Sequence, residues 1–361
     1  MGETVSALWG SVIMNSTELP SVSAIVPVFN KAPYIVEAIR SLQDQNYPNL
    51  EVVLVDDGST DESYAVVQQL PQLFPLLKIK GYQQRNGGAS DARNAAIARS
   101  TGQYIVNMDA DDIMTPGFLA EAVSVVVQSG ADVVYSDLEL FGDRTGEWIP
   151  HPFDPYYIRY DNCVPSLALF PRALWEKVGG YNVALPFSED WNFFVALTRY
   201  THKFHKIPRK AFRYRQTETG LYHNFIRDAW EWGSPLLMCA QDDLYAVDEV
   251  LQGCEKLKGM PERWTVKIDR FRAIHTNNWL PSFWIGLVAE RRGELQRALE
   301  MFQRSVEISS LQAWLPLYTL GKLVQEVDKR ALLEIFHRVR ILRPDMARVV
   351  NPIIESMTKS T

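Results

Sequence analysis

Two hydrophobic periods alternate along the first 135 residues, and this alternation constrains the fold more than any other feature of the sequence. Short β-branched runs predict strands, and segments with helical spacing, such as Pro33–Gln45 and Ala89–Arg99, lie between them. The predicted strands are Val22–Val28, Glu51–Val55, Leu76–Tyr82, Gln103–Met108 and Asp132–Tyr135. Short connections favour right-handed crossovers, so we expect an α/β fold with a mostly parallel open sheet and helices on both faces.

The rest of the chain changes character. A chain of 361 residues is longer than one core normally supports, about 250–300 residues, so two domains are expected. We expect residues 1–20 to be a flexible N-terminus and residues 21–225 to form the α/β domain, with halves 21–135 and 136–225. Residues 226–361 lack strand-like runs and carry amphipathic patterns, which predict an all-α region.

The helical region contains a period of 34 residues. Phe302 and Phe336 are separated by this period, and a helical segment with a central glycine precedes each of them, at Gly286 and Gly321. The pattern resembles two tetratricopeptide repeats, with a plain helical bundle as the alternative. Stacked repeats form a concave surface, which predicts a protein partner or self-association through this region.

Composition argues against several classes of protein. The formal net charge of −6 does not favour a broad nucleic-acid-binding surface. Cys163, Cys239 and Cys254 lack Cys-x-x-Cys spacing and are expected to be buried thiols in a reducing compartment. No apolar run approaches the ~18 residues of a transmembrane segment. Met1–Pro20 has no basic stretch before an apolar core, so we expect a cytoplasmic location, either free or peripheral at the inner membrane face.

Acidic residues follow two of the predicted strands. Asp56 and Asp57 end one apolar run, and Asp109, Asp111 and Asp112 follow another. In a parallel sheet both clusters would lie at the same edge, where ligands of such sheets bind. Crowded carboxylates repel one another, so a bound Mg²⁺ or Mn²⁺ would account for them. The alternative is that these acids cap helices and form turns.

Several short motifs, taken together, resemble family 2 glycosyltransferases, which are inverting enzymes with the A-type nucleotide-sugar-binding fold. The resemblance covers about residues 20–225 and leaves the helical region outside. The motifs, in the order of the family, are Val26–Asn30, Val55–Asp61, Arg85–Gly88 with Ala92–Asn94, Asp109–Asp112 and Ser188–Asp190.

The resemblance implies a nucleotide-sugar site in the first half of the α/β domain. It assigns the donor-binding positions Pro27, Phe29, Asp57, Gly88, Arg93 and Asp109. Asp57 would accept a hydrogen bond from the base or ribose, and Gly88 would let the backbone approach the nucleotide. For Arg93 two roles stay open: a phosphate contact, or an ion pair with a carboxylate at the edge of the sheet.

The resemblance also implies the metal ligands. Asp111 would coordinate Mn²⁺ or Mg²⁺ directly, and Asp109 would lie nearer the ribose. Where the family commonly has a histidine after Tyr-Arg, this sequence has Thr217, so His223 is a candidate third ligand. The alternative for His223 is an ordinary loop residue.

The acceptor side of the site would be formed by the second half of the domain. In the family, the position of Asp190 is the general base that removes the proton of the acceptor hydroxyl, as direct inversion requires. Glu189 would be its neighbour in acceptor binding. The alternative is structural: Ser188 caps a helix, and the two acids occupy its first turn.

Together these features predict a metal-dependent inverting glycosyltransferase. It would move one sugar from a nucleotide-sugar, with a UDP-sugar as first candidate, to a hydroxyl of a carbohydrate, lipid-linked or protein acceptor. The Gln-x-x-Arg-Trp signature of processive synthases is absent. The alternatives are a nucleotidyltransferase, which would need a glycine-rich basic motif near the first strand, and an inactive nucleotide-sugar-binding or scaffold protein acting through its repeats.

Overall fold

The computed structural model describes residues 19–217, 232–310, 312–323 and 329–358. Their contacts divide the chain into two units. The first comprises Met1–Asn182 and Glu189–Ile226, and the second comprises Val183–Ser188 and Arg227–Thr361. The predicted flexible N-terminus, residues 1–20, lies outside the described residues except for its last two.

The first unit is built on one mixed sheet with the strand order β3-β2-β1-β4-β8-β6-β9-β5, and β7 pairs with β6. The strands are β1 Val22–Val28, β2 Leu50–Asp56, β3 Lys78–Gln83, β4 Tyr104–Asn107, β5 Ile113–Met114, β6 Val133–Gly142, β7 Gly146–Trp148, β8 Leu169–Pro171 and β9 Phe204–Gln216. Strands β1 to β4 pair in parallel, as the sequence predicts. Strand β8 runs antiparallel to both β4 and β6, so the second half of the sheet is mixed rather than mostly parallel.

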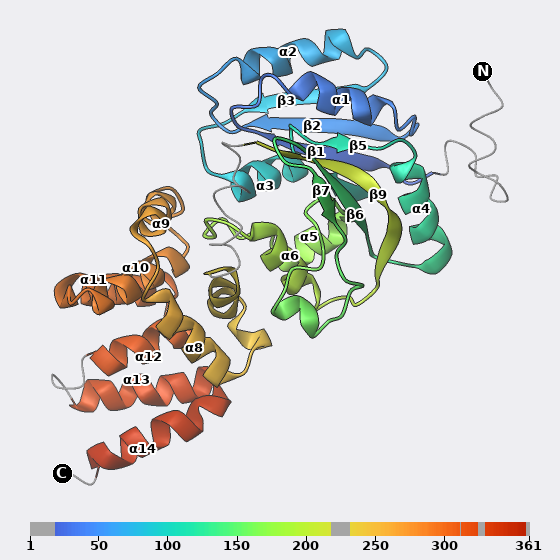
Figure 1. Cartoon of the computed structure of the whole chain (residues 1–361). Helices are drawn as coiled ribbons and strands as arrows, with labels where there is room; N and C mark the ends of the chain where they lie inside the picture. The colour runs from blue at the N-terminus through green and yellow to red at the C-terminus, as the bar shows by residue number, and fades with distance from the viewer. Residues whose placement is uncertain (1–18, 218–231, 311, 324–328, 359–361) are drawn as a thin grey trace. The chain divides into compact units, whose positions relative to one another are not determined.

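Helices pack on both faces of these strands. They are α1 Ile35–Gln43, α2 Ser63–Leu73, α3 Ala89–Arg99, α4 Phe118–Ser129, α5 Arg172–Val178 and α6 Glu189–Leu197. The chain moves outward from β1 to β3 through α1 and α2 and returns to β4 through α3. Right-handed crossovers therefore place α3 on the opposite face from α1 and α2, as Figure 1 shows. The expected α/β fold is confirmed.

Side-chain alternation in β1 explains how the two faces form. Val22, Ala24, Val26 and Val28 point into the core shared with α1 and α2. Successive residues of a strand point to opposite faces, so Ile25, which is also fully buried, points to the other side. A strand buried on both faces reads as a continuous apolar run, and that is the pattern in the sequence.

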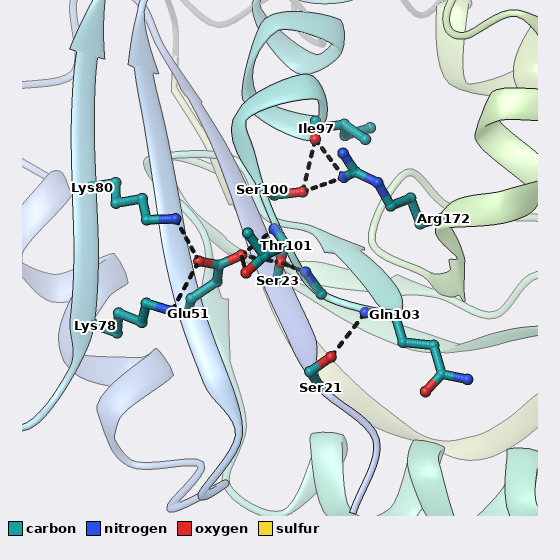
Figure 2. Close-up of polar contacts among 11 residues, drawn as sticks. Ser21, Ser23, Glu51, Lys78, Lys80, Ile97, Ser100, Thr101, Gln103 and Arg172 are labelled. Carbon is teal, nitrogen blue, oxygen red and sulfur yellow. Dashed lines mark hydrogen bonds and ion pairs between the residues drawn. The ribbon is translucent and has the colours of Figure 1, made fainter.

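A buried carboxylate joins the amino ends of the first strands (Figure 2). Glu51 is 4% exposed and accepts hydrogen bonds from Ser23 Oγ at 2.7 Å, Lys80 Nζ at 3.0 Å and Thr101 Oγ1 at 2.8 Å. Burial alone would raise its pKa, but these donors and the Thr101 N–H lower the pKa of Glu51 to about 2. This cluster closes the edge of the sheet opposite to the acidic strand ends.

The second unit is helical in its described parts, which confirms the predicted C-terminal all-α region. Its helices include α8 Val247–Leu257, α9 Glu262–Ile274, α10 Leu280–Arg291, α11 Leu295–Ile308, α12 Trp314–Leu323, α13 Lys329–Leu342 and α14 Ala347–Thr358 (Figure 1). A Cβ atom on Gly286 would lie 2.6 Å from the Phe302 ring, and one on Gly321 would lie 3.0 Å from the Phe336 ring. The 34-residue period therefore corresponds to the same glycine–phenylalanine packing in two consecutive helix pairs.

Two further expectations concern cysteines and membranes. Cys163, Cys239 and Cys254 are free and buried. Within the described ranges, no helix combines the length and the hydrophobicity needed to cross a bilayer.

Candidate active site

The two acidic clusters lie at the same edge of the sheet, as predicted. Asp56 ends β2, and the loop after β4 carries Asp109, Asp111 and Asp112. Both strands pair in parallel with β1, so their carboxyl ends meet at this edge. Exposed Phe29 lies just beyond the end of β1, and Pro27 pairs with Val55 inside the sheet. The predicted donor-binding positions of β1 and β2 therefore share one edge.

Asp57 organises the loop that leads into α3. Its carboxylate oxygens accept hydrogen bonds from the backbone N–H groups of Gly87 and Gly88, both at 2.8 Å, and from the side-chain amides of Gln84 and Asn86. Burial raises the pKa of Asp57, and the two glycine N–H groups oppose this shift. Gly88 has φ of 93°, a left-handed conformation that favours glycine.

Arg93 connects the donor-side acids to the acceptor-side acids. It comes from α3, is 4% exposed, and its Nη2 lies 2.9 Å from Asp109 Oδ1 while its Nη1 pairs with Glu189 Oε1. Burial would lower the pKa of Arg93, but the Asp109 and Glu189 carboxylates raise it above the ordinary arginine value. Of the two roles left open by the sequence, the structure contains the ion pair.

Helix α6 carries the candidate base. Phe193 stacks on Tyr181 with ring centroids 4.4 Å apart, and the Trp191 indole N–H donates to the Ile158 carbonyl, so the first turn of α6 is anchored. Burial, with the neighbouring Glu189 carboxylate, raises the pKa of Asp190 to about 7, although the Arg93 charge opposes the shift. A carboxylate with this pKa accepts protons near neutral pH.

The loop after β4 is held by two basic residues, Lys31 and Arg215, to which the family motifs assign no role. Lys31 Nζ pairs with the Asp111 carboxylate. Arg215 in β9 donates from its backbone N–H to Asp112 Oδ1 at 2.9 Å and from Nε to the Asp111 carbonyl at 2.8 Å. Lys31 and Arg215 lie in or beside family motifs, which indicates that they could belong to the site. The sequence does not show which carboxylate each of them contacts.

The acids of this loop suit a hard divalent cation. Burial raises the pKa of Asp111, and burial with the Asp109 and Asp111 charges raises the pKa of Asp112 well above its usual value. Buried Asp112 Oδ2 has no hydrogen-bond partner among the described residues. Mg²⁺ commonly uses only one or two carboxylates together with waters and phosphates, so Asp109 and Asp111 fit such an ion.

The third predicted metal ligand remains untested. His223 lies outside the described residues. In the part of the chain that the structure describes, no group of three or more His, Cys, Asp or Glu side chains is placed to hold a metal ion by itself.

Comparison with known proteins identifies the part of the chain that carries the donor side of this site. Residues 23–175 match the family model "Glycosyl transferase family 2". Glycosyltransferase GlyG of Streptococcus pneumoniae serotype 4 is 32% identical over 172 residues, which are 48% of this chain and 52% of GlyG. The uncharacterized glycosyltransferase YibD of Escherichia coli K12 is 32% identical over 143 residues, 39% of this chain and 40% of YibD. The chain thus spans about half the length of these relatives or less.

Solved structures show a similar fold. Residues 1–349 of Staphylococcus aureus TarS, crystallised with UDP-GlcNAc, match with a TM-score of 0.53 and 18% identity over 94% of this chain and 92% of that one. The same TarS segment with UDP matches with a TM-score of 0.50 and 17% identity, with the same coverage. This likeness agrees with the A-type glycosyltransferase fold. Residues 23–175, which match the family model, therefore form a family 2 glycosyltransferase domain.

Proposed function

We propose that the chain is a metal-dependent inverting glycosyltransferase that moves one sugar from a nucleotide-sugar to a hydroxyl acceptor in glycan, polysaccharide or glycoconjugate synthesis. The observation that carries the proposal is the Asp190 carboxylate, whose pKa is raised to about 7 and whose neighbour Glu189 is joined through Arg93 to Asp109. Through Arg93, this arrangement connects the neighbour of a base whose pKa lies near 7 to the acids of the donor side.

The chemistry on the acceptor side follows from the state of Asp190. At neutral pH a large fraction of a carboxylate with this pKa is ionised and can take the proton of an acceptor hydroxyl as its oxygen attacks the sugar. Attack from the face opposite the leaving diphosphate inverts the anomeric carbon. Glu189, fixed by Arg93, would hold the acceptor beside the base.

The chemistry on the donor side would use the common edge of β1, β2 and β4. Exposed Phe29 offers a ring face near the nucleotide base, and Gly88 leaves room for close approach of the backbone. The Asp57 carboxylate already accepts four hydrogen bonds, so a direct contact with the base or ribose would replace the Gln84 or Asn86 amide. The backbone N–H bonds of Gly87 and Gly88 would then keep the loop in place.

A bound Mn²⁺ or Mg²⁺ would be held by Asp111 with Asp109 and would neutralise the diphosphate leaving group. The raised pKa values of Asp111 and Asp112, which reflect burial and mutual repulsion, support a cation at this place. His223 stays a candidate additional ligand. A UDP-sugar is the first donor to test because the TarS segment with a similar fold was crystallised with UDP-GlcNAc and with UDP.

The alternative is an inactive nucleotide-sugar-binding or scaffold protein that acts through its helical repeats. Arg93 and Lys31 pair with Asp109 and Asp111, so these acids can be held in place without a metal, as such a protein would require. The acceptor of the enzyme would be a carbohydrate, lipid-linked or protein molecule. In either case the helical unit would bind a protein partner or a second copy. We also propose a cytoplasmic location, free or at the inner membrane face.

The test compares hydrolysis and transfer of a panel of UDP-sugars with Mn²⁺ and with excess chelator, using Asp111→Asn and the control Asp44→Asn. Asp44 is an exposed acid at the end of α1, so its change alters the charge equally without touching the acidic loop. We expect metal-supported turnover to fall by orders of magnitude in Asp111→Asn and to stay unchanged in Asp44→Asn. Full activity in chelator would contradict metal dependence, and nucleotide binding without any turnover would favour the scaffold function.

A further inference from the structure

The Lys31 ammonium pairs with the Asp111 carboxylate. In the proposed function, this carboxylate is the direct ligand of the metal. Lys31 Nζ pairs with Asp111 Oδ2, and the two side chains are 27% and 11% exposed. A divalent cation that binds this carboxylate would meet the ammonium on the same oxygen. Two positive charges a few ångströms apart repel each other strongly in a partly buried site. The ammonium therefore opposes binding of the metal to this carboxylate.

Backbone contacts hold both partners close to this arrangement. The N–H groups of Asn30 and Lys31 donate to Ser59 Oγ at 2.9 Å and to Ser63 Oγ at 2.8 Å, which fixes the chain after β1. On the other side, Arg215 Nε holds the Asp111 carbonyl. Release of the carboxylate therefore requires only rotation of the Lys31 side chain, which is partly exposed and can turn toward solvent or toward an anion.

We propose that Lys31 competes with the divalent cation for Asp111, so that the metal and a nucleoside diphosphate bind cooperatively. Without nucleotide, the ion must displace the ammonium and binds weakly. With nucleotide, the diphosphate supplies new negative charge for the displaced ammonium, and the metal takes the carboxylate. Because coupling between two ligands is reciprocal, the metal must strengthen nucleotide binding by the same factor. The proposal rests on the proposed function in taking Asp111 as a metal ligand and in placing the diphosphate of the nucleotide beside it.

The test measures the binding of Mn²⁺ alone and of Mn²⁺ with UDP by electron paramagnetic resonance of the free ion. In Lys31→Met, Mn²⁺ alone should bind about 5-fold more tightly or better, the lower end of typical coupling between ligands. The gain in Mn²⁺ affinity on adding UDP should shrink by a similar factor. Lys31→Arg keeps the charge and should behave like the natural protein. Lys210→Met is the matched control, because Lys210 pairs with Glu147 and both side chains are nearly half exposed.

Two further measurements separate the ways in which the proposal can fail. Asp111→Asn should abolish Mn²⁺ binding at this site. Thermal melts check that each variant folds. If Lys31→Met does not fold, Lys31→Gln replaces it. If Asp111→Asn removes Mn²⁺ binding but Lys31→Met or Lys31→Gln binds Mn²⁺ no more tightly than the natural chain, the competition is refuted and the metal site stands. If Asp111→Asn leaves Mn²⁺ binding intact, both the competition and the metal role of Asp111 fall.

Discussion

Asp190 is the residue on which the proposed chemistry depends most directly. Asp190→Asn keeps the shape of the side chain but cannot accept a proton, so sugar transfer should fall by ~10²–10⁴-fold. Donor binding should hardly change, because the residue acts on the acceptor. Steady-state transfer rates and UDP titration calorimetry measure the two effects. An unchanged transfer rate would reassign Asp190 to the first turn of α6 as a structural acid, and Asp44→Asn again controls for the change in charge.

The raised pKa of Asp190 also sets the pH dependence of transfer. The base works only when it is ionised, so kcat/KM for transfer should be low below about pH 6 and rise through about pH 7. A lone surface aspartate would give a midpoint near its usual value of about 3.9. Rates measured from pH 5 to pH 9, with Mn²⁺ held constant, locate the midpoint. A profile that is flat across this range would contradict a base with a pKa near 7.

The sequence predicts the positions of some residues of the site better than those of others. Asp57, Asp109 and Asp111 follow apolar strands inside family motifs, so their common edge could be predicted. Arg93 could be placed on its helix, but whether it meets a phosphate or an acid depends on Glu189, which lies 96 residues further along the chain. Lys31 has no motif of its own, and its pairing with Asp111 depends on how two loops approach in space.

At the scale of secondary-structure elements, Glu51 stabilises the amino ends of the sheet. Glu51→Gln should lower the free energy of unfolding at pH 7 by about 1–3 kcal/mol, because it leaves buried donors with a poorer acceptor. The folded pKa of about 2 lies below the unfolded value of 4.5, so the ionised carboxylate contributes fully above about pH 5 and its contribution is lost as the pH falls toward 2. The difference between the natural protein and Glu51→Gln should therefore shrink on acidification.

Urea unfolding at pH 7, pH 4 and pH 2.5 checks this dependence. Glu147→Gln, an acid whose side chain is 49% exposed, provides the control and should leave the free energy of unfolding nearly unchanged. A Glu51→Gln effect that is equally large at all three pH values would mean that side-chain shape, rather than charge, accounts for the stabilisation.

Hydrophobic patterns predict some strands of the sheet and fail to predict others. Strands β1, β2 and β4 are largely apolar runs of four to seven residues separated by helical segments, so their parallel pairing follows from the sequence. Strand β3 is more polar, with Lys78, Lys80 and Gln83, and is identified by its place between two helices. Strand β8 has only three residues, too few for a period, and its antiparallel place between β4 and β6 is set by pairing with distant strands. Strand β9 shifts its register against β6 near Asp137, which interrupts the alternation that would identify it.

At the scale of the whole molecule, a short segment just before α6 belongs to the helical unit by its contacts. Val183–Ser188 groups with the helical unit, although the residues on both sides of it belong to the first unit. Phe187 packs edge-on against Trp264 with ring centroids 4.8 Å apart, and Lys267 Nζ donates to the Pro186 carbonyl at 2.7 Å. Ser188 then adopts φ of 56°, and α6 begins at the next residue. The helical unit thus contains the residues that lead directly to the candidate base.

This connection predicts that a helical residue influences transfer without touching the chemistry. In the full chain, Trp264→Ala removes the ring that holds Phe187 and should lower transfer by about 10-fold or more, since small misplacements of a catalytic group are costly. UDP binding should stay close to that of the natural protein, because the donor-side residues lie in β1, β2, α3 and the loop after β4. Transfer kinetics and UDP calorimetry on the same preparation separate the two.

Trp314→Ala supplies the matched control for this prediction. Trp264 and Trp314 are both 5% exposed and both belong to the helical unit, so each change should destabilise that unit by about 3–5 kcal/mol. Trp314 packs instead against Tyr318 and Arg343. If the segment before α6 positions Asp190, transfer falls in Trp264→Ala and much less in Trp314→Ala at equal loss of thermal stability. Equal losses of transfer would mean that the rate follows the stability of the helical unit rather than the position of Phe187.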